Sequence, residues 1–111
     1  MAWLDRIDIS VPDMNDSFSR VVLDGTQYLL RFTWNETAQR WSFGLFTTQR
    51  EPLMQGLRIV PRFPLNLQTV DERIPNGIFG VFTDFESVGR EDFINGRAAF
   101  VYISAGEEDL F

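Results

Sequence analysis

A two-residue alternation of large apolar and polar side chains is the feature that most constrains the fold of this chain. Residues 27–34 read Gln-Tyr-Leu-Leu-Arg-Phe-Thr-Trp, and a second aromatic series begins at Trp41 after a short polar stretch. Alternation of this kind is typical of half-buried β-strands. Antiparallel pairing of the two series satisfies three large pairs with a single register, which specifies a hairpin. The pairs are Trp34 with Trp41, Phe32 with Phe43, and Leu30 with Leu45.

Turn residues divide the rest of the chain into further short extended segments. Strands are predicted over residues 4–11, 17–23, 78–83 and 98–103, and a short or edge strand followed by an extended connector over residues 52–70. Gly80 suggests a bulge or a close backbone approach, and residues 84–95 form at most one short helical turn. The final predicted strand is apolar on both faces, which suits a central position. No helical periodicity persists over three turns, so the predicted fold is all-β: a small antiparallel barrel or sandwich with about six to eight strands and little helix.

The hairpin around Asp24-Gly25 has two possible registers. A two- or four-residue loop places Val21 on the face of Tyr28, whereas a three-residue loop places Phe18 and Val22 there. The local pattern satisfies both alternatives, and they stay open at this point.

Length and composition limit the chemistry that the chain can perform. A chain of 111 residues suits one compact domain, which we expect to comprise an N-terminal segment (1–16), a β domain (17–104) and an acidic C-terminal tail (105–111). The chain contains no His and no Cys, and all ten of its basic residues are Arg. This excludes a Ser-His-Asp triad, a thiol nucleophile, a Cys/His zinc site and a lysine Schiff base from within the chain. The composition therefore favours a non-enzymatic protein without a cofactor.

The net charge limits the possible partners, and neither a membrane span nor a secretory signal is predicted. A net charge of −6 offers no basic footprint for nucleic acid. No apolar run approaches the roughly 18 residues of a membrane span, and the first residues do not form a secretory signal. The lack of Cys fits synthesis in a reducing cytoplasm.

Two groups of side chains have both a functional and a structural interpretation. The aromatic set of the hairpin resembles a sugar-stacking platform, but the same pattern is that of a core face, which we favour. Four carboxylates near the C-terminal third could chelate calcium or form an acid/base pair, but their spacing matches no calcium loop, and we interpret them as solvated loop charges. The aromatic set is Tyr28, Phe32, Trp34, Trp41 and Phe43; the carboxylates are Asp84, Glu86, Glu91 and Asp92.

The candidate partner-docking residues lie at the two ends of the chain and in the proline-rich connector. Arginine forms bidentate contacts with carboxylates and is enriched at interfaces, and short acidic-hydrophobic ends can add to the sheet of a neighbour. These candidates are Trp3, Leu4, Arg58, Arg62, Arg73, Leu110 and Phe111.

Several segments together resemble a known family. They are Leu23-Asp24-Gly25-Thr26-Gln27-Tyr28, Phe32-Thr33-Trp34-Asn35, Arg40-Trp41-Ser42-Phe43, Pro52-Leu53-Met54-Gln55-Gly56, Leu65-Asn66-Leu67, Ile74-Pro75-Asn76-Gly77-Ile78, and Asp92-Phe93 with Arg97 to Tyr102. This pattern, over residues 17–104, resembles the small contractile-phage tail baseplate proteins typified by the cyanophage baseplate plug. One departure is Gln49-Arg50-Glu51, where such proteins tend to have an Asp-Gly turn.

The resemblance implies a structural part of a phage tail baseplate, located in the virion as a plug or connector near the central hub and tube end. Implied partners are other baseplate, hub or tail-tube proteins and symmetric copies of the chain, and no catalytic residues are implied. Two alternatives from other classes remain at this point: a carbohydrate-binding β-sandwich module and a small carboxylate-dependent hydrolase. Buried Trp34 and Trp41 rings would argue against the first alternative.

Overall fold

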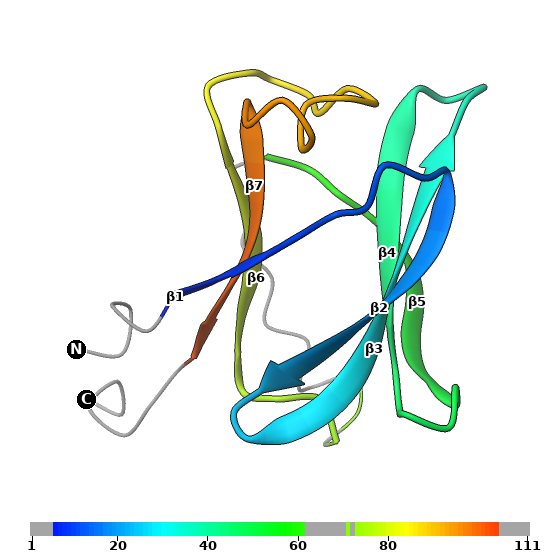
Figure 1. The fold of residues 1–111 in the computed structure, drawn as a ribbon, viewed down its shortest axis with the longest axis vertical. Helices are drawn as coiled ribbons and strands as arrows, with labels where there is room; N and C mark the ends of the chain where they lie inside the picture. Colours follow the sequence, from blue (N-terminus) through cyan, green and yellow to red (C-terminus); the bar gives the residue numbers. More distant parts are fainter. Residues whose placement is uncertain (1–5, 62–70, 72, 105–111) are drawn as a thin grey trace.

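The computed structural model describes residues 6–61, 71 and 73–104. These residues form seven strands and no helix, arranged as two antiparallel sheets that face each other (Figure 1). The strands are β1 (Arg6–Ile9), β2 (Asp16–Leu23), β3 (Thr26–Asn35), β4 (Arg40–Phe46), β5 (Pro52–Arg58), β6 (Gly77–Thr83) and β7 (Ala98–Ser104). The sheets do not close into a barrel, so the predicted all-β class is confirmed in its sandwich form. No helix in the described part of the chain has the length and apolar character needed to cross a membrane.

The larger sheet has the strand order β2-β3-β4-β5, and its centre is the predicted aromatic hairpin. Trp34 lies opposite Trp41, and the two other predicted pairs also lie in register. The indole rings of Trp34 and Trp41 pack edge to face with centroids 5.5 Å apart, a favoured geometry for aromatic pairs. The register prediction is therefore confirmed.

The β2–β3 hairpin turns through the two residues Asp24 and Gly25, whose φ angles are 53° and 82°. Two positive φ angles in succession are the mark of a type I′ turn, whose twist matches that of the flanking strands. This loop places Val21 opposite Tyr28, which decides between the two registers left open by the sequence.

Strand β5 forms one edge of the larger sheet, as predicted. Its pairing with β4 shifts on either side of Leu45, and Gly56 has a φ of 75°. The turn before β5 contains the departure from the family pattern: Arg50 takes a φ of 67°, the left-handed conformation that glycine adopts most easily. The guanidinium of Arg50 lies 4.6 Å from the ring centroid of Phe18, which gives this arginine a stacking contact on the outer face of the sheet.

The smaller sheet has the order β1-β7-β6, which confirms the central position of the last strand. The β6–β7 register continues without a shift through Gly80, so of the two features predicted there the bulge does not occur. Strand β1 ends at Ile9, earlier than predicted, because the chain then crosses to the larger sheet (Figure 1). Residues 84–97 form turns and bends at the end of the sandwich where β6 ends and β7 begins.

Aromatic rings from both sheets fill the space between them. The ring of Phe100 on β7 lies 5.1 Å from that of Phe32 and 5.0 Å from that of Phe43, both from the larger sheet. Phe79 on β6 adds a contact of 5.7 Å with Phe43. Because these rings carry most of the buried area, they fix how the two sheets face each other.

Candidate docking surface

Arg58 and Arg73 are the predicted docking residues that fall within the described part of the chain. Trp3, Leu4, Arg62, Leu110 and Phe111 lie outside the described residues, as does the C-terminal tail 105–111. Both Arg58 and Arg73 are exposed, but the structure places them in different electrostatic surroundings.

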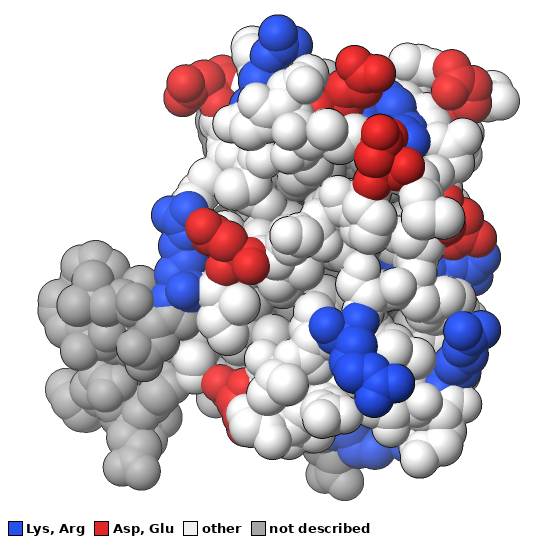
Figure 2. All heavy atoms as spheres, viewed as in Figure 1, with Lys and Arg blue, Asp and Glu red and all other residues white. Residues whose placement is uncertain are grey.

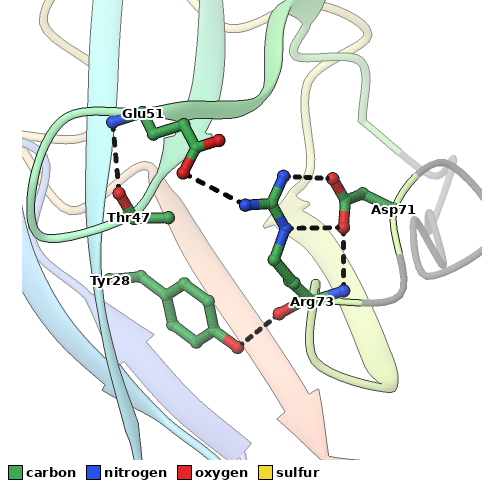
Figure 3. A network of polar contacts seen from close by, with 5 residues as sticks. All are labelled: Tyr28, Thr47, Glu51, Asp71 and Arg73. Atoms are coloured by element: carbon green, nitrogen blue, oxygen red, sulfur yellow. Dashed lines mark hydrogen bonds and ion pairs between the residues drawn. The ribbon is translucent and has the colours of Figure 1, made fainter.

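Arg73 is held inside a network of polar contacts that joins three parts of the chain (Figure 3). Its guanidinium forms two hydrogen bonds with the Asp71 carboxylate, of 3.1 and 2.8 Å, and an ion pair of 3.1 Å with Glu51. Its backbone carbonyl accepts a hydrogen bond of 2.7 Å from the Tyr28 hydroxyl on β3. The Arg73 side chain therefore links Asp71 to Glu51 in the turn before β5.

Electrostatics within this network follow directly from the contacts. Hydrogen bonds from the Arg73 side chain and backbone N–H lower the pKa of Asp71 to about 2, and the same contact raises the pKa of Arg73. Burial raises the pKa of the Tyr28 hydroxyl. Asp71 and Arg73 are thus both charged over the whole physiological pH range.

Arg58 ends β5 and lies at the border of a surface groove of about 190 Å³. The groove also carries Arg40, which begins β4, and its lining includes the buried side chains of Ile59, Pro61 and Val88. Neither guanidinium has an ion pair or hydrogen bond within the part of the chain that the structure describes. Sequence reasoning singled out Arg58 but missed Arg40, because the two residues meet only through the β4–β5 pairing.

The aromatic set is part of the core. Trp34 is 7% exposed and Trp41 is 1% exposed, and Tyr28, Phe32 and Phe43 are buried as well. The indole N–H groups are also in use, donating to Glu36 Oε1 at 2.9 Å and to the Gly89 carbonyl at 3.1 Å. These rings present no face to a sugar, so the stacking platform of the carbohydrate-binding alternative is absent from this hairpin.

The four candidate carboxylates do not act alike. Asp84, Glu86 and Glu91 are exposed, in line with solvated loop charges. Asp92 is different: its carboxylate accepts a hydrogen bond of 2.7 Å from the Gly89 N–H, and its carbonyl accepts from the N–H groups of Arg97 and Ala98. Asp92 therefore shapes the loop before β7. Within the described residues, no three acidic side chains gather closely enough to hold a metal ion.

Two further polar contacts join distant segments and were not predicted. The Tyr102 hydroxyl on β7 donates a hydrogen bond of 2.6 Å to Asp24 in the β2–β3 turn. Arg90 donates to Asn15 at 2.7 Å, forms an ion pair of 3.1 Å with Asp13, and lies 5.3 Å from the Trp41 ring centroid. The first contact spans 78 residues and the second 75, so no local sequence pattern reveals either of them.

The surface charges are interspersed on the face shown in Figure 2. On this face acidic and basic side chains alternate around a largely uncharged area. The chain's net charge of −6 is not gathered into a single acidic patch there. Most arginines of the described residues are engaged by a neighbour in the chain, which leaves the groove of Arg40 and Arg58 as an unusual cationic feature.

Comparison with known proteins agrees with the resemblance drawn from the sequence. The chain finds no match among curated proteins. A family model described as the cyanophage baseplate Pam3 plug gp18 matches residues 4–106, which is nearly the whole chain and extends beyond the expected 17–104. A match of this extent supports a structural role in a phage tail baseplate. The chain belongs to the cyanophage baseplate plug family.

Proposed function

We propose that this protein is a non-enzymatic structural component of a contractile-tail baseplate, acting as a plug or connector near the central hub and tube end. In this proposal several symmetric copies assemble in the host cytoplasm and are carried in the virion. Family membership supports the baseplate role, and the use that the chain makes of its polar groups supports the absence of catalysis.

The observation that carries the proposal is that several of the chain's acid–base side chains make contacts within its own fold. With no His, Cys or Lys, the remaining candidates for chemistry are carboxylates and hydroxyls. The Asp24 carboxylate accepts a hydrogen bond from a distant strand, and the carboxylates of Asp71 and Asp92 bind groups two and three residues away in their own loops. Both tyrosine hydroxyls donate to groups distant in sequence. Such contacts make a small sandwich a well-defined rigid body, which a docking part requires.

We further propose that the chain ends and the connector over residues 58–73 contact neighbouring baseplate proteins, while the Trp34–Trp41 hairpin serves as scaffold. Trp3, Leu4, Arg62, Leu110 and Phe111 are the proposed contacts at the ends and in the connector, together with Arg58. Arg73 completes this set, and its guanidinium contacts Asp71 and Glu51. A plug held by many modest contacts can be released when the baseplate rearranges and favours a different set.

The test is the presence of the protein in purified particles and its position there. Mass spectrometry of intact virions should detect the chain, and short cross-linkers should join it to hub or tube-end proteins. Deleting residues 106–111 should lower its incorporation, whereas the Arg20→Ala variant, which changes an exposed arginine on β2, should be incorporated normally. Absence of the chain from particles would refute the baseplate role, and normal incorporation of the truncated chain would remove the C-terminal contact.

A further inference from the structure

The groove bordered by Arg40 and Arg58 is a mainly polar surface hollow that carries both guanidinium groups. It lies where β4 begins and β5 ends, beside residues 86–88 of the loop that follows β6. Ile59, Pro61 and Val88 contribute buried apolar side chains to its lining, and its volume is about 190 Å³. A ligand that complements this groove should carry carboxylates.

The two guanidinium groups are available to such a ligand. The described arginines elsewhere are engaged by an ion pair, a hydrogen bond or an aromatic ring of the same chain; they are Arg6, Arg20, Arg31, Arg50, Arg73, Arg90 and Arg97. Glu86 borders the same groove, but it forms no ion pair with Arg40 or Arg58 in the described structure. Two arginines without an ion pair among the described residues, in a chain of net charge −6, favour an anionic partner. Guanidinium groups bind carboxylates in a bidentate manner.

We propose that this groove binds the acidic segment Glu107-Glu108-Asp109-Leu110-Phe111 of a second copy of the chain. Its three successive carboxylates, Glu107, Glu108 and Asp109, complement the two arginines of the groove. This inference rests on the proposed multi-copy baseplate role. A contact of this kind is heterologous, so a closing rotation between copies generates a ring.

The position of the groove favours a neighbouring copy over the segment's own chain. Thr83 and Ala98 pair at the end of the sandwich next to the groove, whereas Ser104 pairs with Gly77 at the opposite end of β7. Strand β7 itself spans about 20 Å at roughly 3.3 Å per residue. Residues 107–109 follow Ser104 by only three to five positions, about 10 to 17 Å of fully extended chain. This is shorter than β7 itself, which favours the groove of a neighbouring copy.

A labelled peptide of residues 105–111, Ala-Gly-Glu-Glu-Asp-Leu-Phe, tests the proposal directly. Fluorescence anisotropy should show saturable binding of this peptide to the full-length protein at low salt. The double variant Arg40→Ala/Arg58→Ala should bind on the order of fivefold more weakly, because two exposed charge pairs are lost. Arg20→Ala is the matched control, since it removes an equal charge from an exposed strand position away from the groove, and it should bind as the wild type does.

A second peptide separates charge recognition from apolar contact. Replacing its three acids with amides (Glu107→Gln, Glu108→Gln, Asp109→Asn) should abolish the difference between the wild-type protein and the double variant. Urea midpoints equal to that of the wild type would show that the variants are folded. Absence of saturable binding, or equal weakening by the double variant and by Arg20→Ala, overturns the proposal. The baseplate role is read independently from the particle composition, so either conclusion can fail alone.

Discussion

Raising the pH above 10 should destabilise this protein through its two tyrosines. Because the chain has no Lys, Cys or His, its two tyrosines are the only side chains that titrate between about pH 6 and 12. The α-amino group is the one other group that titrates in this range. Burial, followed by the hydrogen bond to the Asp24 carboxylate, raises the pKa of Tyr102 well above its ordinary value of 10.0. Burial also raises the pKa of Tyr28. Both hydroxyls donate hydrogen bonds in the folded state, which requires their protons.

The sign and size of the effect follow from proton linkage. Below pH 10 both states keep the tyrosine protons, so this contribution to stability is constant. Above pH 10 the unfolded chain loses the Tyr102 proton while the folded protein retains it, and the free energy of unfolding falls by about 1.4 kcal/mol per pH unit. Tyr28 adds to this slope. At pH 7, Tyr102→Phe should cost about 1.5 to 3 kcal/mol, because it removes a hydrogen bond to a charged carboxylate.

Two measurements check this reasoning. Urea denaturation is followed by tryptophan fluorescence at pH 8, 10, 11 and 12. The free energy of unfolding should be constant up to about pH 10 and fall above it, and the fall should be shallower in Tyr102→Phe. Phenolate absorbance at 295 nm should rise together with unfolding. A midpoint near pH 10 while circular dichroism remains native would refute the proposed protection of the hydroxyls, as would an unchanged alkaline slope in the variant.

Three further changes test other contacts. Gly77→Ala should lower the free energy of unfolding by about 2 to 4 kcal/mol, since a Cβ there overlaps the ring and hydroxyl of Tyr102; an unchanged urea midpoint would contradict this. Arg50→Gly should be about 0.5 to 1 kcal/mol more stable than Arg50→Ala in urea denaturation, because both lose the aromatic stack but only alanine is strained at a φ of 67°; equal midpoints would argue against backbone strain. Asp71→Asn should reduce the difference between the free energies of unfolding at pH 7 and at pH 3. The Asp71 carboxylate, with a pKa of about 2, stabilises the fold above about pH 4, and this contribution is lost as the pH falls toward 2. If the variant keeps the wild-type difference in urea midpoint, the Asp71–Arg73 contact does not contribute to acid sensitivity.

Local pattern was sufficient for much of the fold. The Trp34–Trp41 register follows from side-chain alternation alone, because a shift of one residue would expose every large ring. The β2–β3 turn shows where local pattern stops. Both registers were compatible with the sequence. The two-residue turn formed by Asp24 and Gly25, with their positive φ angles, fixes the register that pairs Val21 with Tyr28.

Less of the candidate docking surface could be predicted from the sequence. Arg58 and Arg73 had the same sequence interpretation, but tertiary contacts engage Arg73 with Asp71 and Glu51 while Arg58 has no such partner among the described residues. Gly80 was expected to mark a bulge or a close backbone approach, and the unbroken β6–β7 register excludes the bulge. Pairing between segments distant in sequence decides both cases.

By itself, the sequence determined the all-β class, the strand order along the chain, the aromatic core face and the absence of His, Cys and Lys. These properties depend on residue type and on spacing over a few residues, where sterics and side-chain alternation dominate. The tertiary structure alone decided that β1 joins β7, that Tyr102 meets Asp24, and that Arg40 and Arg58 share a groove. Each of these contacts joins residues that only the packing of the whole chain brings together, so no local free-energy preference encodes them.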